Sequence, residues 1–128
     1  MLKAKDIMTS DVVTIQPSAL VSEAIGLMRQ NKIHAVIVKP RAPEKAYGIV
    51  TEADIAYKVV ARDSDPKALT VADVMTKPCI TVKPDMTVEN VARLFATSHI
   101  HRAPVVKDEL LGIVSISDIL QKGKWWQE

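Results

Sequence analysis

The chain contains two copies of one sequence pattern, and this duplication constrains its fold more than any other feature. A shift of 67 positions places residues 5–39 on residues 72–106. A shift of 64 then places residues 48–55 on residues 112–119, because the first copy is longer in the proline-rich stretch 40–45. Such self-similarity predicts two copies of one structural unit. The identical pairs of the first alignment are Asp6 and Asp73, Met8 and Met75, Thr9 and Thr76, Thr14 and Thr81, Pro17 and Pro84, Val21 and Val88, Leu27 and Leu94, Ile33 and Ile100, His34 and His101, and Val38 and Val105.

Both copies predict the element order β-α-β-β-α, and hence an α/β fold. In each copy a short β-branched run ends at a proline, and the cap-type residues Ser18 and Asp85 predict the start of a helix. A second helix is expected to begin at Thr51 or Ser115. Strands are expected at residues 12–15, 34–38 and around Gly48 in the first copy, and at 79–82, 103–106 and around Gly112 in the second.

The pattern also predicts where the repeats begin and end. The first repeat is placed at residues 1–63, a linker at 64–71, the second repeat at 72–122 and a tail at 123–128. A unit of about 60 residues buries only about 60% of its unfolded surface. The copies are therefore expected to pack with pseudo-two-fold symmetry, with any ligand in the cleft between them.

Composition narrows the classes of function. With 17 Lys and Arg against 15 Asp and Glu, the formal charge is +2, too small a field to capture nucleic acid or acidic membranes. Aromatic residues form 4% of the chain and leave few platforms for stacking bases. The charged N-terminus and the lack of a long apolar run exclude a secretory leader and a membrane span. The single cysteine is typical of a reducing compartment, so a cytoplasmic location is expected.

The sequence favours neither an enzyme nor a metal protein. It has no G-x-S-x-G, Walker A or Rossmann motif, and its three His and one Cys lack the spacing of a zinc site. No cofactor is expected. Cys79 aligns with Val12 of the other copy, so we expect a small buried side chain rather than a nucleophile.

The best-matched segment, Gly-x-x-(Thr/Ser)-x-x-Asp, supports two interpretations. It occurs as Thr51 with Asp54 and as Ser115 with Asp118. A hydroxyl followed three residues later by an acid approximates a capping box. The same strand-to-helix turn suits an anion, and a carboxylate there can accept hydrogen bonds from two adjacent hydroxyls, as on a ribose. The two roles are compatible, and both stay open.

A basic pair precedes one apolar strand of the second copy. His101 and Arg102 correspond to His34 and Ala35 in the first copy. A histidine at such a junction is more often a partly buried polar group than a ligand contact, whereas a guanidinium fork suits a phosphate. We expect an asymmetrically bound phosphate to lie at Arg102.

Other apolar residues predict packing or association. Met8 and Met75 are expected to pack beneath the first loop of each copy, with the wall of an adenine pocket as the alternative. Trp125 and Trp126 are expected to dock on this chain or on a second one. Further surface for self-association is expected from Ile55, Val59, Val60, Ile119 and Leu120.

Taken in order, these motifs resemble a tandem pair of cystathionine β-synthase (CBS) domains, often called a Bateman module. The doubled D-(I/V)-M-T loop, the T-(I/V)-x-P strand end, H-R-A-P-V-V, and G-I-V-(T/S)-x-x-D-I carry the resemblance over nearly the whole chain. The chain is similar to the small stand-alone CBS-pair proteins of bacteria and archaea. The resemblance implies regulation by AMP, ADP, ATP or S-adenosylmethionine bound between paired repeats, and homodimerisation into a disc of four repeats.

The resemblance also implies which residues bind the ligand. Asp54 and Asp118 are implied to hold the ribose hydroxyls, with Thr51, Ser115 and Ser117 as hydroxyl partners. The residues implied to contact phosphates, as in the gamma subunit of AMP-activated kinase, are His101 and Arg102, with His34 as the weaker counterpart. Those implied to line the adenine pocket are Thr14, Thr81, Met75, Pro78, Cys79 and Ile80.

The function expected from all of this is a sensor whose nucleotide alters the dimer arrangement or the interaction with an unidentified protein partner. The alternative is a ligand-independent module for dimerisation and protein interaction, in which the Thr/Ser–Asp pairs serve only as helix caps.

Overall fold

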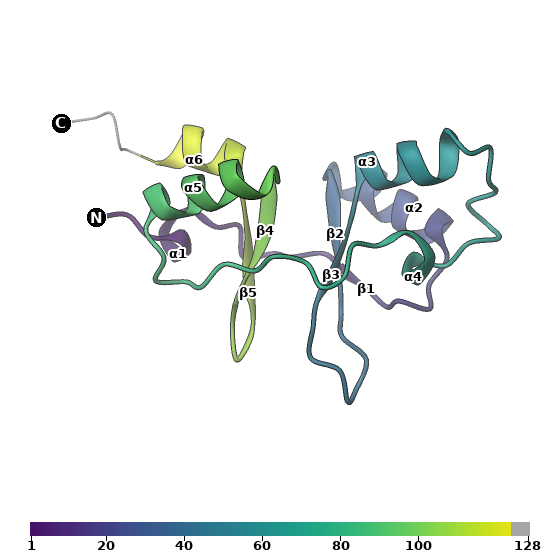
Figure 1. Cartoon of the computed structure of the whole chain (residues 1–128), viewed down its shortest axis with the longest axis horizontal. Helices are drawn as coiled ribbons and strands as arrows, with labels where there is room; N and C mark the ends of the chain where they lie inside the picture. The colour runs from purple at the N-terminus through teal and green to yellow at the C-terminus, as the bar shows by residue number, and fades with distance from the viewer. Residues whose placement is uncertain (124–128) are drawn as a thin grey trace. The chain divides into compact units, whose positions relative to one another are not determined.

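A computed structural model describes residues 1–123 of the chain, which form two compact units (Figure 1). One unit is Val13–Cys79, and the other combines Met1–Val12 with the chain from Ile80 onward. Each unit combines helices with a small sheet, which confirms the predicted α/β class. The predicted docking of Trp125 and Trp126 lies outside the described residues.

The unit Val13–Cys79 is built around a three-stranded sheet of order β1-β2-β3. β1 runs parallel to β2, with Thr14 opposite Ile37, and β2 runs antiparallel to β3, with Ala35 opposite Thr51. This is the strand order expected for a β-α-β-β unit. The elements are β1 (Thr14–Ile15), α2 (Val21–Asn31), β2 (Ala35–Val38), β3 (Gly48–Thr51), α3 (Glu52–Ile55), the π-helical turn η1 (Ala56–Val60) and α4 (Val71–Val74).

The second unit repeats this plan with a two-stranded sheet. β4 and β5 form an antiparallel pair in which Arg102 lies opposite Ser115. The strand expected at 79–82 is reduced to one parallel bridge, from Val82 to Val105. The elements are α1 (Ala4–Ile7), α5 (Val88–Ser98), β4 (Arg102–Lys107), β5 (Glu109–Ser115) and α6 (Ile116–Lys122).

The first long helix of each copy begins later than predicted, so Ser18 and Asp85 are not its caps. The N-cap residues are Leu20 and Thr87, and the Thr87 hydroxyl accepts a hydrogen bond from Asn90 N–H. Asp85 instead pairs with Lys5 at 3.2 Å. That ammonium holds the pKa of the Asp85 carboxyl below its usual range.

The four-residue helices α1 and α4 are absent from the sequence prediction, which treats these segments as loops. The α1 helix belongs to the unit that contains α5, and the α4 helix belongs to the unit that contains α2. Ala4 N–H donates to the Met86 carbonyl at 2.8 Å, and Val71 N–H donates to the Ala19 carbonyl at 2.8 Å. So short a helix is unstable alone. These tertiary contacts, which a local pattern does not reveal, therefore hold it.

Each unit has its own apolar core. Val36, Val38 and Val50 of the sheet pack with Val21 and Met28 of α2 in one unit. In the other, Val105 and Val114 of the sheet pack with Val91 and Phe95 of α5. Met75 and Met8 pack against these cores, as predicted.

The helix positions expected to form a self-association surface divide into two groups. Ile55, Val59 and Ile119 are buried in the cores of their own units, so that part of the prediction is wrong. The reason is that they occupy the inward stripe of their helices. Val60 and Leu120 are 70% and 60% exposed, as a surface role requires.

Gly26 is a site where alanine is expected to stabilise the chain. It lies inside α2, and a Cβ added there meets no atom within 4 Å. Gly26→Ala should raise the free energy of unfolding by about 1 kcal/mol, because alanine loses less backbone entropy in a helix. Urea unfolding followed by circular dichroism measures the difference. A destabilised variant would show that this helix face is covered.

Candidate ligand site

The same hydrogen-bonded turn joins a strand to a helix in both units. Thr51 ends β3 and caps α3: its N–H and hydroxyl donate to Asp54 Oδ2 at 2.9 and 3.1 Å, and its hydroxyl accepts from Asp54 N–H at 3.2 Å. Ser115 ends β5 and makes the same three contacts with Asp118, at 2.9, 3.1 and 3.2 Å. The capping-box interpretation is therefore confirmed at both positions.

A lysine that the sequence reasoning missed completes each turn. Lys58 Nζ lies 3.1 Å from Asp54 Oδ1, and Lys122 Nζ lies 3.0 Å from Asp118 Oδ1. An acid followed by a lysine four residues later is a recognisable helical pair. Its recurrence at the same place in both copies was the available signal.

Asp54 and Asp118 can each accept few hydrogen bonds beyond those within the turn. Both Asp side chains are only 12% exposed. Oδ2 accepts two hydrogen bonds within the turn, and Oδ1 forms an ion pair with the lysine. A carboxylate oxygen offers about two acceptor directions. One direction on Oδ1 is thus open to a hydroxyl donor at each site.

The basic residues near these turns differ between the two units. His34 Nδ1 lies 3.0 Å from Glu52 Oε2, and the His34 carbonyl accepts from Glu52 N–H at 3.0 Å. In the other unit the His101 carbonyl accepts from Ile116 N–H at 2.9 Å, so isoleucine stands where the first copy has its glutamate. Arg102 begins β4 opposite Ser115 and is half-buried, which places it beside that turn.

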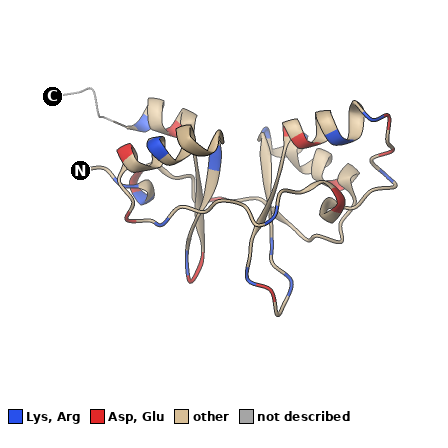
Figure 2. Cartoon of the chain, viewed as in Figure 1, with Lys and Arg blue, Asp and Glu red and all other residues tan. Residues whose placement is uncertain are grey.

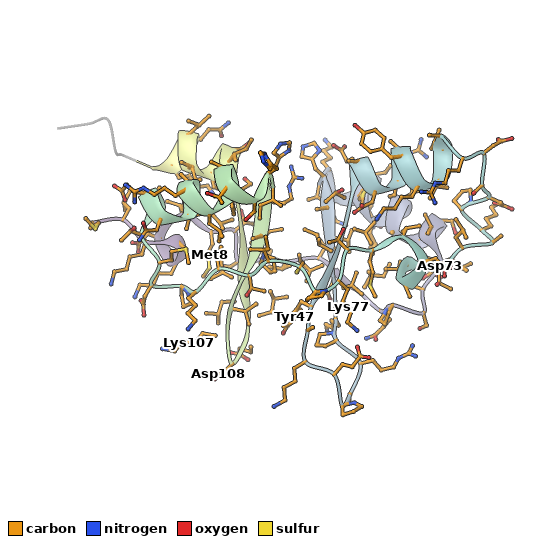
Figure 3. The ribbon with its side chains drawn as sticks, in the orientation of Figure 1. Met8, Tyr47, Asp73, Lys77, Lys107 and Asp108 are labelled. Atoms are coloured by element: carbon orange, nitrogen blue, oxygen red, sulfur yellow. The ribbon has the colours of Figure 1, made fainter. Side chains whose placement is uncertain are left out.

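The residues implied for the adenine pocket fall in different places. In the unit Val13–Cys79, Thr14 lies on β1, Met75 follows α4 beside Gly48, and Cys79 N–H donates to the Tyr47 carbonyl at 3.0 Å. Pro78 is exposed in the same segment. In the other unit, Thr81 and Ile80 are exposed before Val82, and Ser117 is exposed on α6. Tyr47 is labelled in Figure 3.

Basic and acidic residues both occur in each of the two units. Figure 2 shows basic and acidic residues distributed over both units. Among the described residues, no group of three or more His, Cys, Asp or Glu side chains is placed to hold a metal ion. No helix in this part of the chain is both long enough and apolar enough to span a bilayer.

Cys79 is expected to react slowly with alkylating reagents while the chain is folded. Burial raises the pKa of its thiol to about 11, so little thiolate is present at pH 8. Iodoacetamide should modify the folded chain at least about tenfold more slowly than the urea-unfolded chain. Cys79 is half-buried and not fully buried as predicted. Mass spectrometry against time measures both rates, and equal rates would contradict the raised pKa of this thiol.

The raised pKa of Cys79 also makes the stability of the fold depend on pH. The unfolded chain loses the Cys79 proton near the ordinary pKa of 9.0, whereas the folded chain keeps it to about 11. Stability from this group is therefore expected to fall as pH rises through that window. Comparing the unfolding midpoints of the unaltered chain and Cys79→Ser at pH 8 and 10 measures this contribution.

Comparison with known proteins identifies the family to which the chain belongs. The CBS domain matches the chain twice, at residues 4–61 and 71–124. The chain belongs to the CBS domain family, as a tandem pair of CBS domains.

Individual relatives agree with this assignment. The chain is 37% identical over 113 residues to the uncharacterized protein MK0525 of Methanopyrus kandleri, covering 87% of this chain and 57% of that protein. It is 33% identical over 127 residues to the inosine-5'-monophosphate dehydrogenase of Methanocaldococcus jannaschii, covering 98% of this chain and 24% of the enzyme. The chain thus spans little more than half of one relative and a quarter of the other.

A solved structure shows the same fold at higher identity. The hexameric CBS-CP12 protein from bloom-forming cyanobacteria superposes with a TM-score of 0.95 at 51% identity, over 99% of this chain and 74% of that chain.

Proposed function

We propose that the chain is a regulatory module that binds adenosyl ligands, such as AMP, ADP, ATP or S-adenosylmethionine, at its strand-to-helix turns. The observation that carries the proposal is the duplicated Thr/Ser–Asp arrangement. In it a nearly buried carboxylate keeps one acceptor direction open on Oδ1. A preorganised acceptor of this kind suits a ribose hydroxyl, because little ordering remains to be done on binding. The resemblance to CBS pairs assigns the ribose to Asp54 and Asp118.

The two sites are proposed to differ in their affinity for a phosphate. Arg102 lies beside the Ser115 turn and carries a planar donor fork that suits a phosphate. At the other turn Ala35 replaces the arginine, and His34 is paired with Glu52, whose negative charge disfavours an anion. We therefore assign the tighter nucleotide site to Asp118, with His101 and Arg102 at the phosphate and Ser117 as a hydroxyl partner.

The base is proposed to lie against the segments before the first helix of each copy. The residues assigned to it are Thr14, Thr81, Met75, Pro78, Cys79 and Ile80. A bound nucleotide shifts the chain between states only by its difference in affinity for them. The states we propose are arrangements of a homodimer, read by a protein partner of the cytoplasm.

A second candidate, a module for protein interaction alone, is favoured by a separate observation. Tyr57 and Val60 are 71% and 70% exposed on η1, and Leu120 is 60% exposed on α6. The related CBS-CP12 protein is a hexamer. Exposed apolar helix faces of this kind are typical of association surfaces.

A thermal-shift panel separates the two candidates. AMP, ADP, ATP and S-adenosylmethionine are each added to the chain, with guanosine monophosphate as a control for the base. A ligand at about 100 times its dissociation constant adds about 2.7 kcal/mol of stability, a rise in melting temperature on the order of 5–10 °C. We expect this rise for at least one adenosyl ligand and not for the guanosine control. No rise with any ligand at millimolar concentration would favour the interaction module.

A further inference from the structure

We infer that Lys58 and Lys122 are positioning residues that fix the candidate ribose acids, Asp54 and Asp118, relative to the segments that follow α4 and α1 and lead to residues proposed to contact the base. Lys58 Nζ contacts Asp54 Oδ1 at 3.1 Å and donates to the Val74 carbonyl at 2.8 Å. Lys122 Nζ contacts Asp118 Oδ1 at 3.0 Å and donates to the Ile7 carbonyl at 3.4 Å. The inference rests on the proposed function for its ligand, although the contacts themselves do not.

The arrangement occurs twice with every member in an equivalent position. Lys58 and Lys122 are related by the shift of 64 that also relates Asp54 to Asp118. The carbonyl acceptors, Val74 and Ile7, are related by the shift of 67 that relates α4 to α1. A chance surface contact need not recur in both copies, whereas a contact with the same role in both copies does.

The carbonyl end of the contact adds a side-chain donor to the backbone hydrogen bonds that hold each short helix. Val74 and Ile7 are the last residues of α4 and α1, where helix carbonyls lack partners within the helix. Helices of four residues do not persist alone. A lysine ammonium at the last turn supplies a donor and a favourable charge. The lysine therefore sets where each short helix stops.

The chain beyond each short helix leads out of its unit. After Val74 it runs through Met75 and Thr76, which pairs with Ile49, to the unit boundary at Cys79. After Ile7 it runs through Met8 and Thr9, which pairs with Ile113, to the boundary at Val12. Residues 75–79 include those we assign to the base. Lys58 thus joins Asp54 to the beginning of the base segment through two contacts. Lys122 joins Asp118 in the same way to residues 8–12, which lead to Thr14.

At the carboxylate, the lysine determines which side of Oδ1 is left for a ligand hydroxyl. With Oδ2 occupied by Thr51 or Ser115, the lysine takes one direction of Oδ1 and leaves the other. Without the lysine the carboxylate keeps its cap but loses the partner that orients Oδ1. We therefore expect removal of the lysine to leave the fold intact and to loosen both the acid and the following segment.

Amide hydrogen exchange of the ligand-free chain tests the tether directly. The variants are Lys58→Met and Lys122→Met, which keep the length of the side chain, with Lys67→Met as a control for loss of an exposed charge. Lys58→Met should speed exchange at Met75, Thr76 and Cys79 about tenfold and leave Met8 and Thr9 unchanged. Lys122→Met should do the reverse. Changes no larger than those in Lys67→Met, or spread evenly over both units, would overturn the inference.

Ligand affinity tests the positioning role. In a chain that binds AMP, the Lys→Met change at the occupied site should weaken binding about tenfold, equivalent to one hydrogen bond to a charged group. Lys→Arg at that site should restore the affinity to within about twofold, because a guanidinium can also span the carboxylate and the carbonyl. A purely structural lysine leaves the affinity of the folded chain unchanged, and that result would overturn the positioning role.

The two failures are distinguishable. No binding of any of the four adenosyl ligands by the unaltered chain defeats the proposed function, and the exchange measurement still decides the tether. Normal AMP binding with unchanged exchange in both Lys→Met variants defeats the tether and leaves the proposed function standing.

Discussion

Gly112→Ala is expected to lower the free energy of unfolding by about 3 kcal/mol, because this position has no room for a methyl group. A Cβ added to Gly112 would lie 2.7 Å from Met8 Sδ and 2.8 Å from the Thr9 carbonyl oxygen. Thr9 and Ile113 exchange two backbone hydrogen bonds of 2.9 Å across the same contact. The methyl group must therefore push apart a paired backbone as well as a flexible side chain.

The equivalent glycine of the other copy provides a matched control. A Cβ on Gly48 would lie 3.0 Å from Met75 Sδ and 3.3 Å from the Thr76 carbonyl oxygen, so the backbone is less crowded. Gly48→Ala is expected to cost about 1 kcal/mol, the low end for overpacking. Urea unfolding of both variants measures the difference. Equal losses, or a larger loss at Gly48, would contradict the crowding described for Gly112.

Asp118→Ala is expected to weaken nucleotide binding at the tighter site, with at least about a tenfold loss of affinity for the adenosyl ligand. The substitution removes the acceptor proposed for the ribose and leaves the N–H and hydroxyl of Ser115 without their partner. The loss of the one hydrogen bond that the carboxylate can still accept, at about 1.5–3 kcal/mol, accounts for this size. Isothermal titration calorimetry at a temperature where the variant is folded measures the affinity.

Asp73→Ala separates the loss of a cap from the loss of a ligand contact. Asp73 of α4, labelled in Figure 3, accepts from Thr70 N–H and the Thr70 hydroxyl at 2.8 and 3.0 Å, as Asp118 does from Ser115. Its loss should cost about 1 kcal/mol of stability and leave nucleotide affinity unchanged. Equal effects of Asp73→Ala and Asp118→Ala on affinity would assign Asp118 to the cap alone.

The elements that follow from local pattern could be predicted from the sequence. The α2 and α5 helices carry apolar residues at helical spacing, and β3 and β5 end at a hydroxyl that caps the next helix. Because the pattern occurs twice, each predicted element could be compared with its equivalent in the other copy. The helix starts were misplaced because Ser18 and Asp85 are good cap residues by type, whereas Leu20 and Thr87 hold the cap position.

The remaining features depend on contacts between residues far apart in the chain. The α1 and α4 helices are stabilised by backbone hydrogen bonds to Met86 and Ala19, which no short window of sequence contains. The carbonyl partner of Lys122 is Ile7, at the other end of the chain. Only its pairing with Asp118, four residues away, leaves a local signal. The sequence could therefore suggest the acids and hydroxyls of the site but not the lysine's full role.

The most direct test of the proposed function is a crystal structure of the chain with AMP bound. We expect a ribose hydroxyl within about 2.6–3.2 Å of Oδ1 of Asp118 or Asp54. We also expect the phosphate at Arg102 wherever the Asp118 site is filled. An AMP molecule bound elsewhere, with both carboxylates contacting only their own turn and lysine, would contradict the proposed function.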